Sequence, residues 1–250
     1  MKLAGRRILV TRPRELAQEL ATLIHEAGGE PLLYPALEIG DVADPAPARA
    51  LLARLHEFDL AIFVSPSAVR KAMELAQGVQ MRPAGQVWPA GLRVAAIGAG
   101  TRRALETLGF RDVIAPAGQE DSEALLALPG LAGVRRVAIF RGEGGREVLG
   151  EALAARGARV EYAECYRRVR PAAADAPTGR IDAICVSSGE ALRNLVALLG
   201  RERMVRAPLF VPNARVAGIA RELGLREALP AGPGDAQMLA ALVAYFGDAK

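Results

Sequence analysis

The sequence carries one pattern of strand, helix and glycine turn twice. Residues 6–13 (RRILVTRP) precede an amphipathic stretch that ends at Gly28, and residues 135–142 (RRVAIFRG) precede one that ends at Gly157. The two strands, and likewise the two glycines, are separated by the same 129 positions. A repeat of this length indicates one supersecondary structure built twice, so we expect two similar lobes and a ligand cleft where they meet.

A second pair of segments also recurs. Residues 59–65 (DLAIFVS) and residues 182–187 (DAICVS) are each followed by a helical pattern and by another short apolar run. Strands that alternate with helices of this length are typical of parallel sheets with helices on both faces. We therefore predict an α/β fold with two similar, doubly wound parallel-sheet lobes of the flavodoxin-like kind.

The two lobes are not predicted to follow one another along the chain. The first strand and helix provide too few strands for a stable sheet, and the last third of the chain lacks such a first pair. We expect one discontinuous lobe that combines residues 1–36 with residues 172–250, and a second lobe inserted at 41–163. Segments 33–40 and 162–170 are expected to join them as two adjacent linker strands.

Some finer boundaries can also be predicted. Ser122 is expected to cap a helix that runs to Leu128, because serine is a favourable N-cap residue. After a strand at 208–211, the pattern predicts only two helices, at 213–222 and 235–246.

Composition excludes several classes of function. Of the 250 residues, 51% are hydrophobic and 24% charged, which is typical of a globular protein. The net charge of +4 and the 4% aromatic content are too low to indicate nucleic-acid binding, but they suit an anionic small molecule. No signal peptide and no apolar run of membrane-spanning length is recognised, so we expect a cytoplasmic protein that binds no membrane.

The residues that most often bind metals or cofactors are sparse. Cys165 and Cys185 form no Cys-x-x-Cys pair and lie in apolar stretches, so we interpret them as packed, reduced thiols. His25 and His56 stand alone, without other ligands at a suitable spacing. We predict neither a metal nor a cofactor.

Ligands of open parallel sheets lie beyond the carboxyl ends of the strands, where helix N-termini offer free N–H groups. The corresponding loops contain hydroxyls, glycines and arginines but no Ser/His/Asp set or paired carboxylates, so we expect them to cradle an anion. Capping explains the serines equally well, and the arginines can also be surface charges. The candidate substrate-binding residues are Thr11, Arg12, Pro13, Ser65, Ser67, Gly98, Thr101, Arg141, Gly142, Ser187, Ser188, Asn213 and Ala214.

The glycines also allow a dinucleotide-binding interpretation. Residues 142–144 (GEG) follow a strand, and Glu161 or Glu164 lies near the distance expected for an acid that binds ribose. However, Glu147 occupies the position of the third glycine of that fingerprint. The pattern therefore disfavours a nicotinamide enzyme.

Six short motifs, in this order, resemble those of the uroporphyrinogen-III synthase family, and the resemblance spans essentially the whole chain. Two positions depart from the family: Ser67 stands where it often has Asn, and Asn213 where many members have Thr. The motifs are ILVTRP (8–13), FVSPSAV (63–69), AIGAGT (96–101), RG with GRE (141–142 and 145–147), YRR (166–168) and VSS (186–188).

The resemblance implies a cofactor-free lyase of haem biosynthesis that cyclises hydroxymethylbilane to uroporphyrinogen III. The last pyrrole ring is inverted through a spiro intermediate, and water is lost. The resemblance further implies two α/β lobes with a two-stranded linker and an active site between the lobes. Tyr166 matches the family's tyrosine that assists departure of the hydroxyl, although a tyrosine packed in a linker strand remains an alternative interpretation.

Partners follow from the same resemblance. The substrate is a linear tetrapyrrole with eight carboxylates, which suits arginines and helix N-termini. We expect a monomer that makes transient contact with the preceding enzyme of the pathway. A two-lobe module that binds an anionic ligand without turnover remains the alternative.

Overall fold

The computed structural model of the 250-residue chain describes residues 2–77, 88–89, 91–117, 121–172 and 176–247. It divides into two compact units. The split unit comprises Met1–Glu38 and Val169–Lys250, and the inserted unit comprises Ile39–Arg168. The chain therefore passes from one unit to the other twice, after Glu38 and after Arg168.

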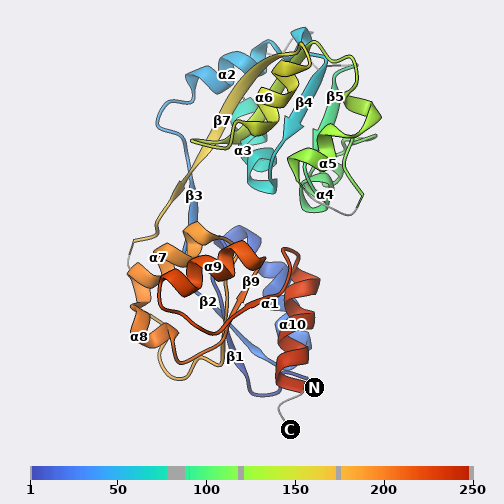
Figure 1. Ribbon diagram of the computed structural model, residues 1–250. Helices are drawn as coiled ribbons and strands as arrows, with labels where there is room; N and C mark the ends of the chain where they lie inside the picture. The colour runs from blue at the N-terminus through green and yellow to red at the C-terminus, as the bar shows by residue number, and fades with distance from the viewer. Residues whose placement is uncertain (1, 78–87, 90, 118–120, 173–175, 248–250) are drawn as a thin grey trace. The chain divides into compact units, whose positions relative to one another are not determined.

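The split unit is built on a parallel sheet with the strand order β10-β9-β8-β1-β2 (Figure 1). Counted along the unit's own chain, this order is 5-4-3-1-2, which is that of flavodoxin-like folds. Within the described residues the strands of this sheet are β1 (Arg7–Val10), β2 (Glu30–Leu33), β8 (Ala183–Cys185), β9 (Leu209–Val211) and β10 (Ala228–Pro230).

Helices cover both faces of this sheet because alternate residues of its buried strands point to opposite sides. Leu9 and Ile184 pack under α7, α8 and α9, whereas Ile8 and Ala183 pack under α1 and α10. The bounds of these helices are α1 (Gln18–Glu26), α7 (Gly189–Leu199), α8 (Arg201–Met204), α9 (Ala214–Glu222) and α10 (Asp235–Gly247).

The inserted unit has its own sheet, with the order β3-β7-β6-β4-β5. Strands β7, β6, β4 and β5 pair in parallel, and Ile114 continues the sheet as an isolated bridge beside Ala95 of β5. The described strands are β3 (Glu38–Gly40), β4 (Leu60–Phe63), β5 (Arg93–Ala96), β6 (Arg136–Gly142) and β7 (Arg159–Val169).

The helices of the inserted unit again cover both faces of the sheet (Figure 1). Phe63 and Phe140 stack at 4.6 Å between ring centroids on the face of α2, α3 and α4. Ile62 and Ile139 pack under α5 and α6 on the other face. These helices are α2 (Ala46–Ala53), α3 (Pro66–Ala76), α4 (Ala99–Thr107), α5 (Ser122–Leu126) and α6 (Val148–Ala155).

The repeat in the sequence is a repeat in the structure. The unit β1-α1-β2 corresponds to β6-α6-β7, and β8-α7-β9 corresponds to β4-α3-β5. The shared aspartate has the same task in both copies: Asp59 Oδ2 accepts the N–H of Arg136 at 2.8 Å, and Asp182 Oδ2 accepts that of Arg7 at 2.9 Å. Gly28 also has a left-handed backbone, with φ of 91°. The predicted α/β fold with two similar parallel-sheet lobes is confirmed.

Two local predictions were wrong. Asp121, and not Ser122, caps α5, because its carboxylate accepts the N–H of Ala124 at 2.8 Å; the helix ends at Leu126, before Leu128. Strand β10 was not predicted, since three residues that end in proline carry no strand pattern, yet Ala228 pairs with Leu209 of β9. Among the described residues, no helix is long and apolar enough to cross a membrane.

Candidate functional site

A cavity of about 430 Å³ opens at the carboxyl edge of the sheet in the inserted unit. Ser65 after β4, Arg141 and Gly142 at the end of β6, and Tyr166 on β7 all line it. Four of the predicted site residues therefore share one cavity. Its apolar wall is formed by Val64, Ile97, Ile139, Val148 and Leu149.

Ser65 holds the start of α3 and contacts Tyr166 at the same time. Its backbone is extended (φ −164°), and its hydroxyl oxygen accepts the N–H of Ala68 at 3.1 Å, as an N-cap does. Pro66 follows at the first helical position, where its missing N–H is not needed. The Ser65 Oγ also lies 3.0 Å from the Tyr166 Oη, and either hydroxyl can be the donor.

Tyr166 reaches the cavity because β7 is irregular at this point. Arg141 pairs with Glu164, but its neighbour Gly142 pairs with Tyr166, so Cys165 is an extra residue on β7. Such a bulge redirects the side chain that follows it. Cys165 and Tyr166 consequently belong to the same core cluster, on one face of the sheet, although they are consecutive residues of one strand.

Gly142 provides the space for the Tyr166 ring. A Cβ at this position would lie 2.7 Å from Cε2 of the ring, which is closer than any normal contact. The backbone after Gly142 is held to β7, since the N–H of Glu143 donates to the carbonyl of Tyr166 at 2.8 Å. Glycine at 142 is thus required by the tyrosine and not by its backbone conformation.

Arg141 is engaged within the protein. Its guanidinium donates to the Glu164 carboxylate and to the carbonyl of Gly145, both at 3.1 Å, and lies 3.9 Å above the ring centroid of Tyr162. Only its Nε is buried without a hydrogen-bond partner among the described residues. Burial raises the pKa of Tyr162, and the nearby Arg141 charge opposes this effect. Arg141 therefore stabilises the loop after β6.

The sequence-based site omitted four charged residues of the cavity. Arg146 and Arg168 are exposed cations at its wall, and Asp121 and Glu123 supply carboxylates at the start of α5. Both arginines belong to the same motifs as Gly142 and Tyr166, which was the available signal. A cavity with cations, hydroxyls and an apolar wall can bind a ring that carries carboxylate arms.

Three predicted residues of the inserted unit do not line this cavity. Ser67 and Thr101 are 4% exposed, each within the first turn of its helix. Gly98 is buried as the N-cap of α4 and, having no side chain, makes no cap hydrogen bond of its own.

The remaining predicted residues belong to the split unit, beyond β1, β8 and β9. Thr11 is fully buried and donates its hydroxyl to the carbonyl of Cys185 at 2.8 Å, and Pro13 is buried beside it. Arg12 forms an ion pair with Asp235 at 2.8 Å and donates to the carbonyl of Pro233.

Two of these residues are helix caps. The Ser188 side chain accepts the N–H of Ala191, and the Asn213 side chain accepts that of Val216, each at 3.1 Å. Ser187 is half-buried beside the first cap, and Ala214 is exposed at the start of α9.

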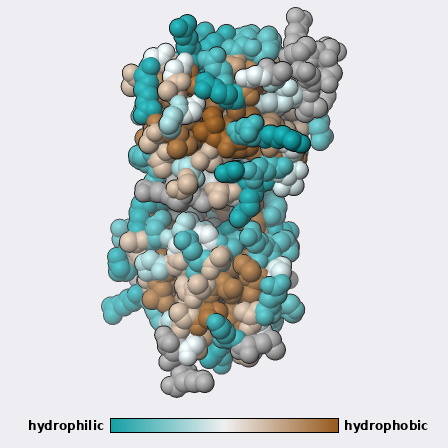
Figure 2. All heavy atoms as spheres, turned by 90° about the vertical axis from the view of Figure 1, so that its right-hand side faces the viewer, coloured by the Kyte–Doolittle hydropathy of each residue, from teal (hydrophilic) through white to brown (hydrophobic). Residues whose placement is uncertain are grey.

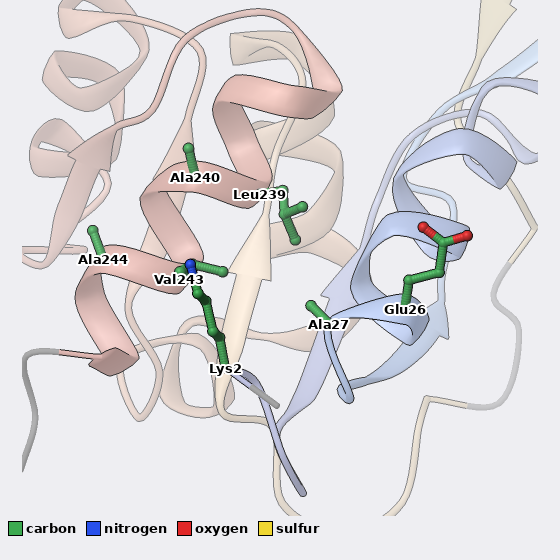
Figure 3. Close-up of a pocket in the computed structure, with 7 residues that line it drawn as sticks. All are labelled: Lys2, Glu26, Ala27, Leu239, Ala240, Val243 and Ala244. Carbon is green, nitrogen blue, oxygen red and sulfur yellow. The ribbon is translucent and has the colours of Figure 1, made fainter.

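A second cavity, of about 570 Å³, lies between the end of α1 and α10 (Figure 3). Lys2 and Ala27 place it at the amino end of β1, opposite to the edge that carries Thr11. The face that includes α10 exposes apolar side chains, seen as brown atoms in the lower half of Figure 2. Since this cavity contains no predicted site residue and lies at the wrong edge of the sheet, we do not assign the reaction to it.

In the described part of the chain, no three His, Cys, Asp or Glu side chains come together in a way that could hold a metal ion. Burial raises the pKa of both Cys165 and Cys185 to about 12, so their reactive thiolate forms are suppressed.

The sequence is similar to known proteins of one family. The model of the family described as uroporphyrinogen-III synthase HemD matches residues 18–240. The chain is 37% identical over 232 residues to the uroporphyrinogen-III synthase of Salmonella typhimurium, covering 88% of this chain and 92% of that protein. It is 34% identical over 232 residues to that of Escherichia coli, with the same coverage of 88% and 92%.

Solved structures show the same fold. The structure of uroporphyrinogen-III synthetase from Helicobacter pylori gives a TM-score of 0.62 at 14% identity, covering 96% of this chain and 99% of that one. A mutant uroporphyrinogen III synthase from Thermus thermophilus gives 0.61 at 20% identity, covering 98% and 100%. With the family match over most of the sequence, these findings show that the chain belongs to the uroporphyrinogen-III synthase family.

Proposed function

We propose that this protein cyclises hydroxymethylbilane to uroporphyrinogen III, with inversion of the terminal pyrrole ring and release of water. We assign the reaction to the cavity of the inserted unit because of one observation. The hydroxyls of Tyr166 and Ser65 lie 3.0 Å apart there, and Arg146 and Arg168 line the same cavity. A phenol supplies a proton there, and the arginines attract carboxylate arms.

Tyr166 acts as the proton donor in this proposal. The bond between carbon and the hydroxyl oxygen of the substrate breaks, the Tyr166 proton moves to the departing oxygen, and water leaves. The substituted carbon of the terminal pyrrole then attacks the cationic carbon, which closes a spiro ring. The bond from this substituted carbon to its original methylene bridge breaks, and the released methylene carbon bonds to the free α-carbon of the same pyrrole, so that the ring is inverted. When the final macrocycle regains its aromatic pyrroles it loses one proton, which restores the phenol. The net change is the loss of one water molecule.

Positioning contributes more than the acid. A bilane that closes unaided does so without inversion, so the protein must hold the substituted carbon within attacking distance. We assign carboxylate binding to Arg146 and Arg168 in the inserted unit. In the split unit we assign it to Arg12, to the hydroxyls of Ser187 and Ser188, and to the N-terminus of α9 beyond Asn213.

The decisive experiment is incubation with freshly prepared hydroxymethylbilane, without added cofactor and with a chelator present. The product is oxidised to the porphyrin and its I and III isomers are separated. We expect mainly the III isomer with protein and the I isomer in the protein-free control. Equal isomer ratios in the two samples would refute the proposed function and favour a binding module without turnover.

The Tyr166→Phe variant tests the proton donor. It should retain the fold, because only the hydroxyl is removed and the rest of the side chain, in a residue that is 5% exposed, still fills its place. We expect the turnover number to fall by about tenfold to a hundredfold, at or below the usual range for one general acid, because the hydroxyl is also lost without an enzyme. Melting temperature serves as the control for folding. Unchanged turnover would remove Tyr166 from the mechanism.

We also propose that the protein acts as a cytoplasmic monomer that receives its unstable substrate through transient contact with the preceding enzyme. The two buried, unpaired thiols are consistent with a reducing compartment. Sedimentation velocity at micromolar concentration tests the monomer, and a dimer at that concentration would contradict it.

A further inference from the structure

The Ser65 hydroxyl has fewer free orientations than a surface serine. One of its lone pairs is occupied by the N–H of Ala68 at 3.1 Å, because Ser65 caps α3. A hydroxyl has one proton and two acceptor positions, so one proton and one lone pair remain. Either the proton or the lone pair can be directed at the Tyr166 hydroxyl, which lies 3.0 Å away.

Two hydrogen-bond arrangements are then possible. If Tyr166 donates to Ser65, the phenolic proton is directed away from a bound substrate. If Ser65 donates to Tyr166, the phenolic proton is free to point into the cavity, and the phenolic oxygen keeps a donor when that proton leaves. Only the second arrangement lets Tyr166 transfer its proton directly to the substrate.

The rest of the Tyr166 side chain cannot adjust to compensate. The bulge at Cys165 and the close approach of Gly142 fix the ring, and Tyr166 is 5% exposed. The helix that Ser65 caps runs over 11 residues, and its N-terminus carries a partial positive charge that favours an electron-rich oxygen nearby.

We propose that Ser65 is a positioning residue for the reaction: it donates to the Tyr166 oxygen, turns the phenolic proton toward the substrate and stabilises the oxygen as the proton departs. This inference rests on the proposed function, in which Tyr166 is the acid. It assigns to Ser65 a role through Tyr166 in place of a direct contact with a substrate carboxylate.

The kinetic test separates the hydroxyl from the cap. Ser65→Gly removes the hydroxyl but keeps a residue that is favourable at an N-cap, whereas Ser65→Thr keeps both properties. We expect Ser65→Gly to lower kcat about tenfold with little change in KM, and Ser65→Thr to restore most of it. In the Tyr166→Phe background, Ser65→Gly should have no further effect, because its partner is already absent.

A spectroscopic test is independent of turnover. The chain has four tyrosines, so labelling with ¹³C at Cζ gives few signals, and loss of one in Tyr166→Phe identifies Tyr166. This signal should shift in Ser65→Gly and return in Ser65→Thr. If the wild-type protein forms no III isomer, the proposed function fails, whatever the signal does. If the wild type is active, three results would refute the role of Ser65. The effects of Ser65→Gly and Tyr166→Phe on kcat could be additive, Ser65→Gly could raise only KM, or Ser65→Gly could leave the Tyr166 signal unmoved.

Discussion

Position 142 must be a glycine because the Tyr166 side chain, 24 positions further along the chain, occupies the space that a Cβ would need. We predict that Gly142→Ala displaces the Tyr166 ring, since the new methyl group would lie 2.7 Å from it. Turnover should fall at least as far as in Tyr166→Phe, and the free energy of unfolding should fall by about 1–3 kcal/mol.

A glycine in a helix of the other unit provides the matched control. A Cβ at Gly218 in α9 would meet only the end of the flexible Arg221 side chain, at 4.0 Å. Gly218→Ala should therefore leave turnover unchanged and stabilise the fold by up to about 1 kcal/mol. Activity and thermal unfolding check both variants. An active Gly142→Ala protein would show that the ring can move without consequence.

Two arginines of the same cavity should respond differently to substitution. Arg141 is 8% exposed and bonded to Glu164 and Gly145, so Arg141→Ala should lower the free energy of unfolding by about 2–4 kcal/mol and also impair activity. Arg146 is exposed, so Arg146→Ala should change stability by less than about 0.5 kcal/mol and raise KM several-fold.

Denaturant unfolding and the substrate dependence of the rate distinguish these two effects. The distinction would be wrong if Arg141→Ala unfolded like the wild type, because Arg141 would then be a ligand-binding residue and not a support for the loop. It would also be wrong if Arg146→Ala bound substrate normally.

At the scale of elements, an aspartate directly before β4 in one sheet and before β8 in the other joins neighbouring strands. Hydrogen bonds from the N–H groups of Arg136 and Arg135 lower the pKa of Asp59. Burial raises the pKa of Asp182, but the bonds from the Arg7 N–H and from Arg180 outweigh it, so this pKa is lowered as well.

We predict that Asp59→Ala and Asp182→Ala each lower the free energy of unfolding by about 1–3 kcal/mol at pH 7. A carboxyl group with a lowered pKa in the folded state stabilises it above the ordinary pKa, and this contribution is lost as the pH falls through the lowered value. The difference between variant and wild type should therefore shrink toward pH 3. Urea unfolding at pH 7 and pH 3 measures it.

Glu222, an exposed acid at the end of α9, is the control for these two variants. Glu222→Ala should change the free energy of unfolding by less than about 0.5 kcal/mol at either pH. An unaltered stability in both aspartate variants would mean that water replaces the carboxylates at no cost.

The elements show what a sequence can predict. Strands such as β4, with four fully buried residues, and caps such as Ser65 and Ser188 follow from local patterns. The contact between Ser65 and Tyr166 could not be predicted, because it joins residues 101 positions apart through a bulge. Asp121 and Ser122 are equally good caps by type, and only the backbone decides between them.

For the whole molecule, the division into two units was predictable because each copy of the repeat is a local pattern that can be recognised in the sequence. Each unit also contains core clusters of its own, formed by Phe63 and Phe140 in one and by Leu9 and Ile184 in the other. We propose that 33–40 and 162–170 act as the connections, consistent with passages of the chain after Glu38 and Arg168.

We predict that residues 39–168 fold without the rest of the chain, because they contribute a sheet with helices on both faces. The isolated segment should give a cooperative thermal transition and dispersed amide NMR signals. A segment of residues 1–38 alone is the control and should remain unfolded, since it holds only β1 and β2 of its sheet. An unfolded 39–168 segment would contradict the prediction.

The neighbour of β1 in its sheet has a consequence for synthesis on the ribosome. Leu9 pairs with Ile184, so β1 must wait for a partner that is translated some 175 residues later. At the usual rates of elongation this delay lasts roughly 10–35 s. During that time the whole inserted unit is completed, while an apolar strand edge near the N-terminus stays open. The nascent chain is thus most exposed to aggregation and to chaperones before Cys185 has been made.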